Sequence, residues 1–187
     1  SDTWSIGILL DQLSHIYNAI ITNTNQHSEI FSELQYTDYA QWHKSYIHSD
    51  TINNQLPFWK EYLNDFKMLQ LPMDNKRPNK PSFEGQQYIS HISSELLSKI
   101  KKISKDENTT LFMMLQSLFT LLLYALTGET DITTGTLTAN RVRKELESMI
   151  GFFANTVAIR STINNESSVK SFIKQNKSNA PAKAGQT

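Results

Sequence analysis

The apolar residues at the start of the chain repeat with a helical period, yet the first third of the sequence offers almost nothing to cover them. Seven of these residues share one helix face because they recur at three- and four-residue steps: Ile6, Leu9, Leu10, Leu13, Ile16, Tyr17 and Ile20. Asp2 or Thr3 can cap this helix, since either side chain can accept a hydrogen bond from a first-turn N–H. Two aromatic-rich helical segments follow at 36–47 and 55–66, and Pro57 is expected to start or kink the second. We therefore expect this helical part to be an incomplete lobe.

The sequence pattern changes at residue 68. Residues 68–85 contain three prolines and no apolar periodicity, which favours an extended segment between two lobes. The elements expected beyond it are a strand at 86–93, helices capped by Ser93 or Ser94 and by Thr109 or Thr110, strands at 131–139 and 152–163 around a short helix at 143–149, and a last helix at 167–177. The fold class is therefore α/β. The small and polar residues 179–187 predict a disordered tail.

Composition excludes several classes of function. The 18 acidic and 18 basic residues leave no net charge that would attract nucleic acid or an anionic membrane, so neither is expected as a partner. The chain has no cysteine, which excludes disulfides and thiolate metal sites and suits a reducing compartment, the cytoplasm. The longest apolar run, 111–126, is shorter than the roughly 20 residues of a membrane span and contains Gln116, Ser117 and Thr120. A buried helix is the better interpretation of that run.

The histidines and glycines form no metal or nucleotide motif. His43 and His48 are five positions apart and lie on different helix faces, with no carboxylate cluster beside them. Gly85, Gly135 and Gly151 are isolated, which excludes a phosphate-binding loop and a dinucleotide fingerprint. No G-x-S-x-G segment marks a serine as a nucleophile. We therefore expect no metal and no directly bound cofactor.

Three further stretches stand in order along the chain: SDTWSIGILLDQL at 1–13, YTDYAQW at 36–42 and GTLTANRVRKELESMIGFFANTVAIR at 135–160. Together they resemble the condensation domains of nonribosomal peptide synthetases. In that family an H-H-x-x-x-D-G signature runs into a helix that starts W-S, a Y-x-D-Y-A-x-W segment follows, and I-G-x-F-x-N-T-x-x-x-R comes later. The matching residues are Asp2, Trp4 and Ser5; Tyr36, Asp38, Tyr39, Ala40 and Trp42; and Ile150, Gly151, Phe153, Asn155, Thr156 and Arg160. The likeness covers roughly residues 1–178.

The resemblance implies a fold similar to chloramphenicol acetyltransferase, in which two lobes meet at a tunnel. Most of the N-terminal lobe and the end of the C-terminal lobe would be absent here. The implied parts are the helical end of the N-terminal lobe at 1–67, an inter-lobe linker at 68–85, the first half of the C-terminal lobe at 86–178 and a tail at 179–187. If Asp2 is the aspartate of the signature, the second histidine lies four positions earlier, outside the chain. We therefore expect the chain to be inactive alone. Thr3 stands where the signature has glycine.

The reaction that the resemblance implies is peptide-bond formation. The amine of an acceptor aminoacyl thioester attacks the carbonyl of a donor thioester, giving an amide and a free carrier thiol. Both substrates are tethered to phosphopantetheine, which carrier (thiolation) domains supply, and an adenylation domain belongs to the same assembly line. The missing strands of the N-terminal lobe are a further expected partner. The implied products are secondary metabolites such as antibiotics.

Three residues are candidates for supporting roles in this reaction. The resemblance implies that Asp2 pairs with an arginine to hold the histidine loop, and Arg141 in TANR is the candidate partner. The alternative is that Asp2 is only a cap and that Arg141 lies in solvent. Asn155 is expected either to face the tunnel and hydrogen-bond substrate or to close a turn at a strand end. Asp38 and Trp42 are expected to hold helix packing.

Two other interpretations stay open. The chain could be a non-catalytic remnant or a complementing half that folds with a partner chain, because uncovered helix faces and strand edges would otherwise favour aggregation. It could also come from another acyltransferase of the same superfamily, such as an epimerisation or heterocyclisation relative. The order of Trp4 and Ser5 resembles condensation domains more than the epimerising type.

Overall fold

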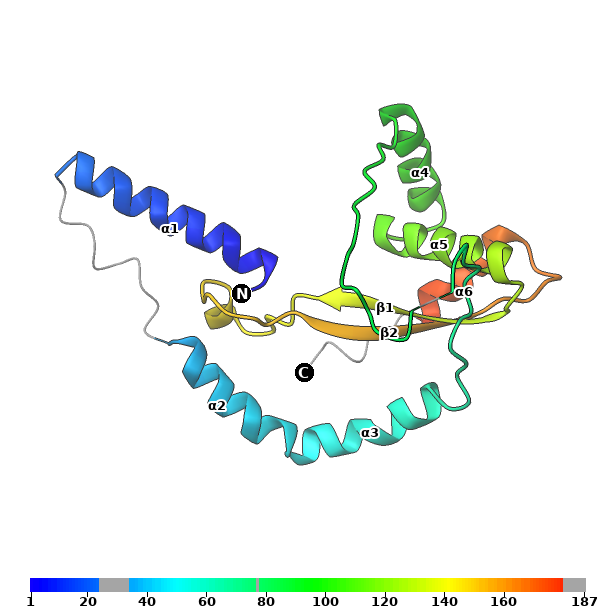
Figure 1. The fold of residues 1–187 in the computed structure, drawn as a ribbon, viewed down its shortest axis with the longest axis horizontal. Coiled ribbons are helices and arrows are strands. Elements are labelled where there is room, and N and C mark those ends of the chain that lie inside the picture. Colours follow the sequence, from blue (N-terminus) through cyan, green and yellow to red (C-terminus); the bar gives the residue numbers. More distant parts are fainter. Residues whose placement is uncertain (24–33, 77, 180–187) are drawn as a thin grey trace. The chain divides into compact units, whose positions relative to one another are not determined.

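The computed structural model describes residues 1–23, 34–76 and 78–179. The helices are α1 (Thr3–Ile21), α2 (Tyr36–Ile47), α3 (Asp50–Tyr62), α4 (Ser94–Asp106), α5 (Leu111–Thr127) and α6 (Val169–Asn179), with a short 3-10 helix η1 (Lys144–Leu146). The strands β1 (Asp131–Thr138) and β2 (Asn155–Thr162) pair in a two-stranded sheet (Figure 1). The chain is therefore a mixed α/β protein, as predicted.

The chain divides into two compact units. The first is built from Ser1–Asn64 and Gly135–Ala158, and the second from Asp65–Thr134 and the segment from Ile159 through α6. Each strand of the sheet therefore contributes one half to each unit. All contacts of the candidate site described below lie within the first unit.

The first unit has a small aromatic core and an uncovered helix. Its buried cluster consists of Tyr39, Leu146, Met149 and Phe153. The ring centres of Tyr39 and Phe153 lie 4.6 Å apart. By contrast, six apolar side chains of α1 are 50 to 65% exposed: Ile6, Leu9, Leu10, Leu13, Tyr17 and Ile20. The predicted helix forms, but the part of the chain that the structure describes does not cover its apolar face.

The second unit is organised around α5. Its buried cluster consists of Leu123, Ile132, Ile163 and Phe172. Thr110 caps the start of α5, as predicted, and Gly128 ends the helix in the left-handed conformation, with φ at 74°. Glu107, just after α4, is buried and pairs with Lys170 and Lys174 of α6 at N–O distances of 2.6 and 3.4 Å. These contacts tie α4 to α6.

Two sequence predictions about local structure are wrong. Residues 86–93 alternate as a strand does, but they form no strand, and Tyr88 among them is 93% exposed. A strand forms when a neighbouring strand satisfies its N–H and C=O groups, and the described sheet contains β1 and β2 alone. The helix predicted at 55–66 runs instead from Asp50 to Tyr62 after Ser49 at the N-cap position. Pro57 therefore lies inside this helix and does not start it.

No single helix in residues 1–23, 34–76 and 78–179 is long and apolar enough to cross a membrane. The helices α4 and α5 meet the length and composition criteria only as a pair that is bent by 105°. The predicted disordered tail lies outside the described residues from residue 180 onward.

Candidate functional site

Asp2 is the residue at which the chain enters α1. Its backbone is extended (φ −97°, ψ 173°), and its Oδ1 caps the helix by accepting a hydrogen bond from the Ser5 N–H at 2.9 Å. Its Oδ2 accepts from the N–H of Phe153 at 3.0 Å, and its own N–H donates to the carbonyl oxygen of Gly151 at 3.1 Å. Thr3 is the first residue of α1, so this position needs no left-handed backbone. Asp2 thus joins the start of α1 to the segment before β2.

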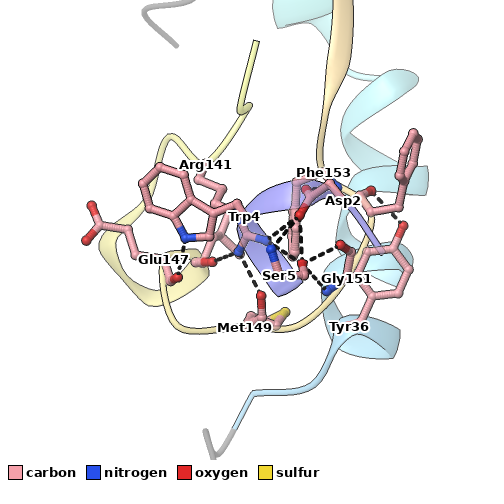
Figure 2. A network of polar contacts seen from close by, with 11 residues as sticks. Asp2, Trp4, Ser5, Tyr36, Arg141, Glu147, Met149, Gly151 and Phe153 are labelled. Carbon is pink, nitrogen blue, oxygen red and sulfur yellow. Dashed lines mark hydrogen bonds and ion pairs between the residues drawn. The ribbon is translucent and has the colours of Figure 1, made fainter. Parts of the chain in front are cut away.

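Arg141 lies against Asp2 (Figure 2). Its Nη2 is 3.3 Å from Asp2 Oδ1, and the two side chains are only 2% and 7% exposed. Its Nη1 donates to the carbonyl oxygens of Leu146 and Met149, and its guanidinium carbon lies 4.1 Å from the centre of the Phe153 ring. The structure therefore brings two of the three predicted site residues together. Asp2 is a helix cap and an ion-pair partner at the same time, and Arg141 does not lie in solvent.

The network holds the Asp2 carboxyl group in its charged form. Burial is the largest influence and raises the pKa of Asp2, but the Ser5 hydroxyl, the N–H groups of Ser5 and Phe153, and the charge of Arg141 oppose it. Together these interactions hold the pKa of Asp2 well below its usual value. A buried carboxylate is therefore charged at neutral pH, and it depends on its partners to remain so.

Ser5 and Gly151, to which the sequence motifs give no role, complete the network. Ser5 is 1% exposed, and its Oγ lies 2.7 Å from Asp2 Oδ1 and 2.9 Å from Arg141 Nη2. A Cβ atom at Gly151 would overlap the ring of Tyr36, so the segment can approach α2 this closely only with glycine there. The sequence indicates only that Ser5 is three residues after the N-cap, where the backbone N–H donates to the capping side chain. Its contact with Gly151, 146 positions away, has no local signal.

Asn155 makes no described contact with Asp2 or Arg141. Its Oδ1 accepts a hydrogen bond from the N–H of the next residue, Thr156, at 2.9 Å, a local contact at the start of β2. The residue is exposed at the start of β2 and lines a cavity of about 390 Å³ in the first unit. His43 and Asn140 are among the polar residues of that cavity. The amide of Asn155 is therefore accessible to a ligand.

Asp38 and Trp42 make local contacts within α2, and their role in helix packing stays a prediction. Asp38 Oδ2 accepts a hydrogen bond from the N–H of Gln35 at 2.9 Å, at the start of α2. The ring of Trp42 stacks on that of Tyr46, with the ring centres 4.9 Å apart. Within the described ranges, no group of three or more His, Asp or Glu side chains could hold a metal ion. The candidate site is therefore the network of Asp2, Ser5 and Arg141 at the start of α1.

Sequence comparison finds relatives along nearly the whole chain. A family model described as "Condensation domain" matches residues 1–183. One of the polypeptides of the linear gramicidin synthase of Brevibacillus parabrevis is 38% identical over 167 residues, which are 88% of this chain and 3% of that protein. The malpinin synthetase of Mortierella alpina is 35% identical over 161 residues, which are 86% of this chain and 2% of the relative. The chain therefore spans a very small part of the curated proteins that it matches.

Solved structures share the fold. A four-domain nonribosomal peptide synthetase in its holo form, bound to AMP and glycine, matches with a TM-score of 0.83 at 26% identity, over 99% of this chain and 14% of that one. The X-domain from teicoplanin biosynthesis matches with a TM-score of 0.85 at 21% identity, over 96% of this chain and 41% of that one. The first condensation domain of the CDA synthetase matches with a TM-score of 0.72 at 12% identity, over 99% of this chain and 39% of that one. These matches confirm the predicted fold class.

Proposed function

Because the chain belongs to the condensation-domain family, we propose that it is part of a domain in which a nonribosomal peptide synthetase forms a peptide bond. The substrates are a donor aminoacyl or peptidyl thioester and an acceptor aminoacyl thioester, each on the phosphopantetheine arm of a carrier domain. The acceptor nitrogen attacks the donor carbonyl carbon, the C–S bond breaks, and the amide and a free carrier thiol are formed. The partners in this proposal are the carrier domains and an adenylation domain of the same assembly line.

The observation that carries the proposal is the buried network of Asp2, Ser5 and Arg141. It fixes the point at which the chain enters α1, which is where the H-H-x-x-x-D-G signature of the family ends. A group that assists bond formation is effective only when it is held within about 0.5 Å of its productive position. A rigid end to the signature supports a reaction that depends on the placement of two tethered substrates.

In this proposal Asp2 and Arg141 position the reaction and do not carry its proton. Asp2 is a poor base at neutral pH because its pKa is held well below the usual value, and Arg141 serves as its counter-charge. We assign removal of the proton of the attacking amine to the histidine expected upstream of Ser1. The 187 residues alone should therefore form no peptide bond. Asn155 is assigned a hydrogen bond to substrate, which its exposed amide on the 390 Å³ cavity supports.

The proposal also assigns the parts of the chain to the domain. Residues 1–67 belong to the N-terminal lobe, 68–85 to the inter-lobe linker and 86–178 to the first half of the C-terminal lobe. Residues 68–76 and 78–85 contain neither helix nor strand, which supports a linker there. A cytoplasmic location is part of the proposal and fits a chain without cysteine.

A second function has support from the uncovered face of α1. Eight apolar side chains of α1 are at least half exposed, and both strands of the described sheet are edge strands. These features favour a complementing half that folds with a separate chain. Such a half would supply scaffold to a partner and no chemistry. It differs from the first proposal in requiring two polypeptides.

A condensation assay separates these functions. The full-length protein that carries this chain and the 187 residues alone are each given a loaded donor carrier and a loaded acceptor carrier, and the acceptor carrier is weighed by mass spectrometry. We expect a peptidyl acceptor carrier with the full-length protein and none with the 187 residues. No product with the full-length protein would contradict the peptide-forming function. Product that appears only after a separate polypeptide is added would favour the complementing half.

A further inference from the structure

Ser5 has more polar neighbours than one hydroxyl group can serve equally (Figure 2). A serine hydroxyl donates one hydrogen bond and accepts two. Arg141 Nη2, at 2.9 Å, and the N–H of Gly151, at 3.0 Å, are donors and occupy the two lone pairs. Asp2 Oδ1 and the carbonyl oxygen of Gly151 are both 2.7 Å away and compete for the single proton.

The competition is decided by charge. Each acceptor has another backbone donor: the Asp2 N–H at 3.1 Å for the Gly151 carbonyl oxygen and the Ser5 N–H at 2.9 Å for Asp2 Oδ1. They differ in charge, because only Asp2 Oδ1 belongs to a buried carboxylate. A hydrogen bond to an ionised acceptor is roughly twice as strong as one to a neutral acceptor. The Ser5 proton therefore points to Asp2. The hydroxyl of Ser5 then donates to Asp2 and accepts from Arg141 at the same time.

The distances show that Ser5 is the closer link between the two charges. The direct separation of Asp2 Oδ1 and Arg141 Nη2 is 3.3 Å, beyond the usual 2.7–2.9 Å of a charge-assisted hydrogen bond. The path through Ser5 Oγ has steps of 2.7 and 2.9 Å. The same oxygen atom also accepts from the Gly151 N–H, so it joins the ion pair to the segment that leads into β2.

We propose that Ser5 is a positioning residue of the condensation site: its hydroxyl bridges Asp2 to Arg141 and fastens Gly151 to the start of α1. This inference rests on the function proposed above. Ser5 would act through Asp2 and Gly151 and would not contact substrate. The backbone cap from the Ser5 N–H to Asp2 is independent of the hydroxyl, so the helix start can survive its removal.

Hydrogen exchange tests the hydrogen bond from the Gly151 N–H to the Ser5 hydroxyl and does not require enzymatic activity. In the full-length protein, Ser5→Ala should speed amide exchange of Gly151 by about tenfold or more, because a buried donor loses its acceptor. Ser5→Thr keeps the hydroxyl and should restore most of the protection. Ser14→Ala is the matched control on the same helix, since the exposed Ser14 hydroxyl donates only to the Leu10 carbonyl, and it should leave Gly151 unchanged. Unchanged exchange at Gly151 in Ser5→Ala would overturn the proposal.

Kinetics test the positioning role. Ser5→Ala should lower kcat of peptide-bond formation about tenfold, with KM within about twofold, and Ser5→Thr should recover most of the loss. Equal kcat values for Ser5→Ala and Ser14→Ala would overturn the role.

The two proposals fail in different ways. If the unmodified full-length protein forms no peptide, the condensation function fails, and Gly151 exchange still decides whether Ser5 fastens the segment. If Ser5→Ala does not fold, the unmodified protein decides the point through its own Gly151 amide. That amide should then be among the slowly exchanging ones, and fast exchange there would overturn the proposal.

Discussion

Replacing Arg141 with methionine tests the ion pair on which the site depends. Methionine keeps much of the length of the side chain but leaves the Asp2 carboxylate, 7% exposed, without a counter-charge. Removing one partner of a buried pair costs about 3–5 kcal/mol, whereas exposed pairs contribute at most about 1 kcal/mol. Asp2 would still accept three hydrogen bonds, from the Ser5 hydroxyl and from the N–H groups of Ser5 and Phe153. We therefore expect a loss near the lower end, about 3 kcal/mol of unfolding free energy.

Urea unfolding of the full-length protein, followed by circular dichroism, measures this loss. Arg143→Met is the matched control, because Arg143 is exposed and its guanidinium carbon lies 5.5 Å from the centre of the Trp42 ring. An exposed cation–π contact is worth about 0.5–1 kcal/mol, so this variant should lose far less than Arg141→Met. If the two variants lost the same free energy within about 0.5 kcal/mol, the pair would not be a buried one in solution and the reasoning would be refuted.

Three further predictions concern Asp2, Gly151 and Arg160. Folding lowers the pKa of Asp2, so the contribution of its carboxylate to folding stability is complete above the unfolded value of about 3.9 and is lost as pH falls through the lowered pKa. The difference in unfolding free energy between the unmodified protein and Asp2→Asn should therefore shrink below about pH 4. A widening difference in urea titrations would contradict this. Gly151→Ala should cost about 1–3 kcal/mol by overpacking, whereas Gly7→Ala in α1, with open space around its Cβ, should be neutral or stabilising by up to about 1 kcal/mol; equal melting temperatures would refute the close approach. Arg160 donates to both carboxylate oxygens of Asp131 at 2.8 and 2.5 Å, so Arg160→Gln should return the lowered pKa of Asp131 toward its usual value, and an unchanged carboxyl titration by NMR would contradict the contact.

The starts of α4 and α5 followed from the sequence because their signals are local. Ser93 and Thr110 cap α4 and α5 by accepting the N–H groups of Leu96 and Met113, three residues on in each case. Both the cap and the apolar repeat lie within a few residues, so one sequence is enough to predict them. The segment 86–93 shows the limit of such signals. Alternation tells which side chains can share a face, but a strand also needs a neighbour, and the pattern carries no information about one.

The site was predictable only in part, for the same reason. The capping role of Asp2 follows from its place before an apolar repeat, whereas its partner Arg141 is 139 positions away and came from the family resemblance alone. The contact of Phe153 with Asp2 spans 151 positions and uses a backbone N–H, which any residue except proline would supply. Contacts made by the backbone leave no mark on residue type, so no pattern of side chains could have predicted them.

The position of α1 depends both on the Asp2 network at its start and on coverage of its apolar face. Ser5, in the first turn of α1, is 1% exposed, whereas Leu13 and Ile20, about two and four turns further along, are 60% and 65% exposed. Contacts at the first turn fix that end of α1, and Ala19 near its other end is buried, but most of its apolar face is exposed. Most helical stability in proteins comes from packing of the apolar face. For the function proposed above, we therefore expect the Asp2 network to position the end of the H-H-x-x-x-D-G signature only when other polypeptide also covers the apolar face of α1. The positioning role of Arg141 and Ser5 then depends on coverage of α1 by other polypeptide. The two are therefore not alternative explanations of the sequence.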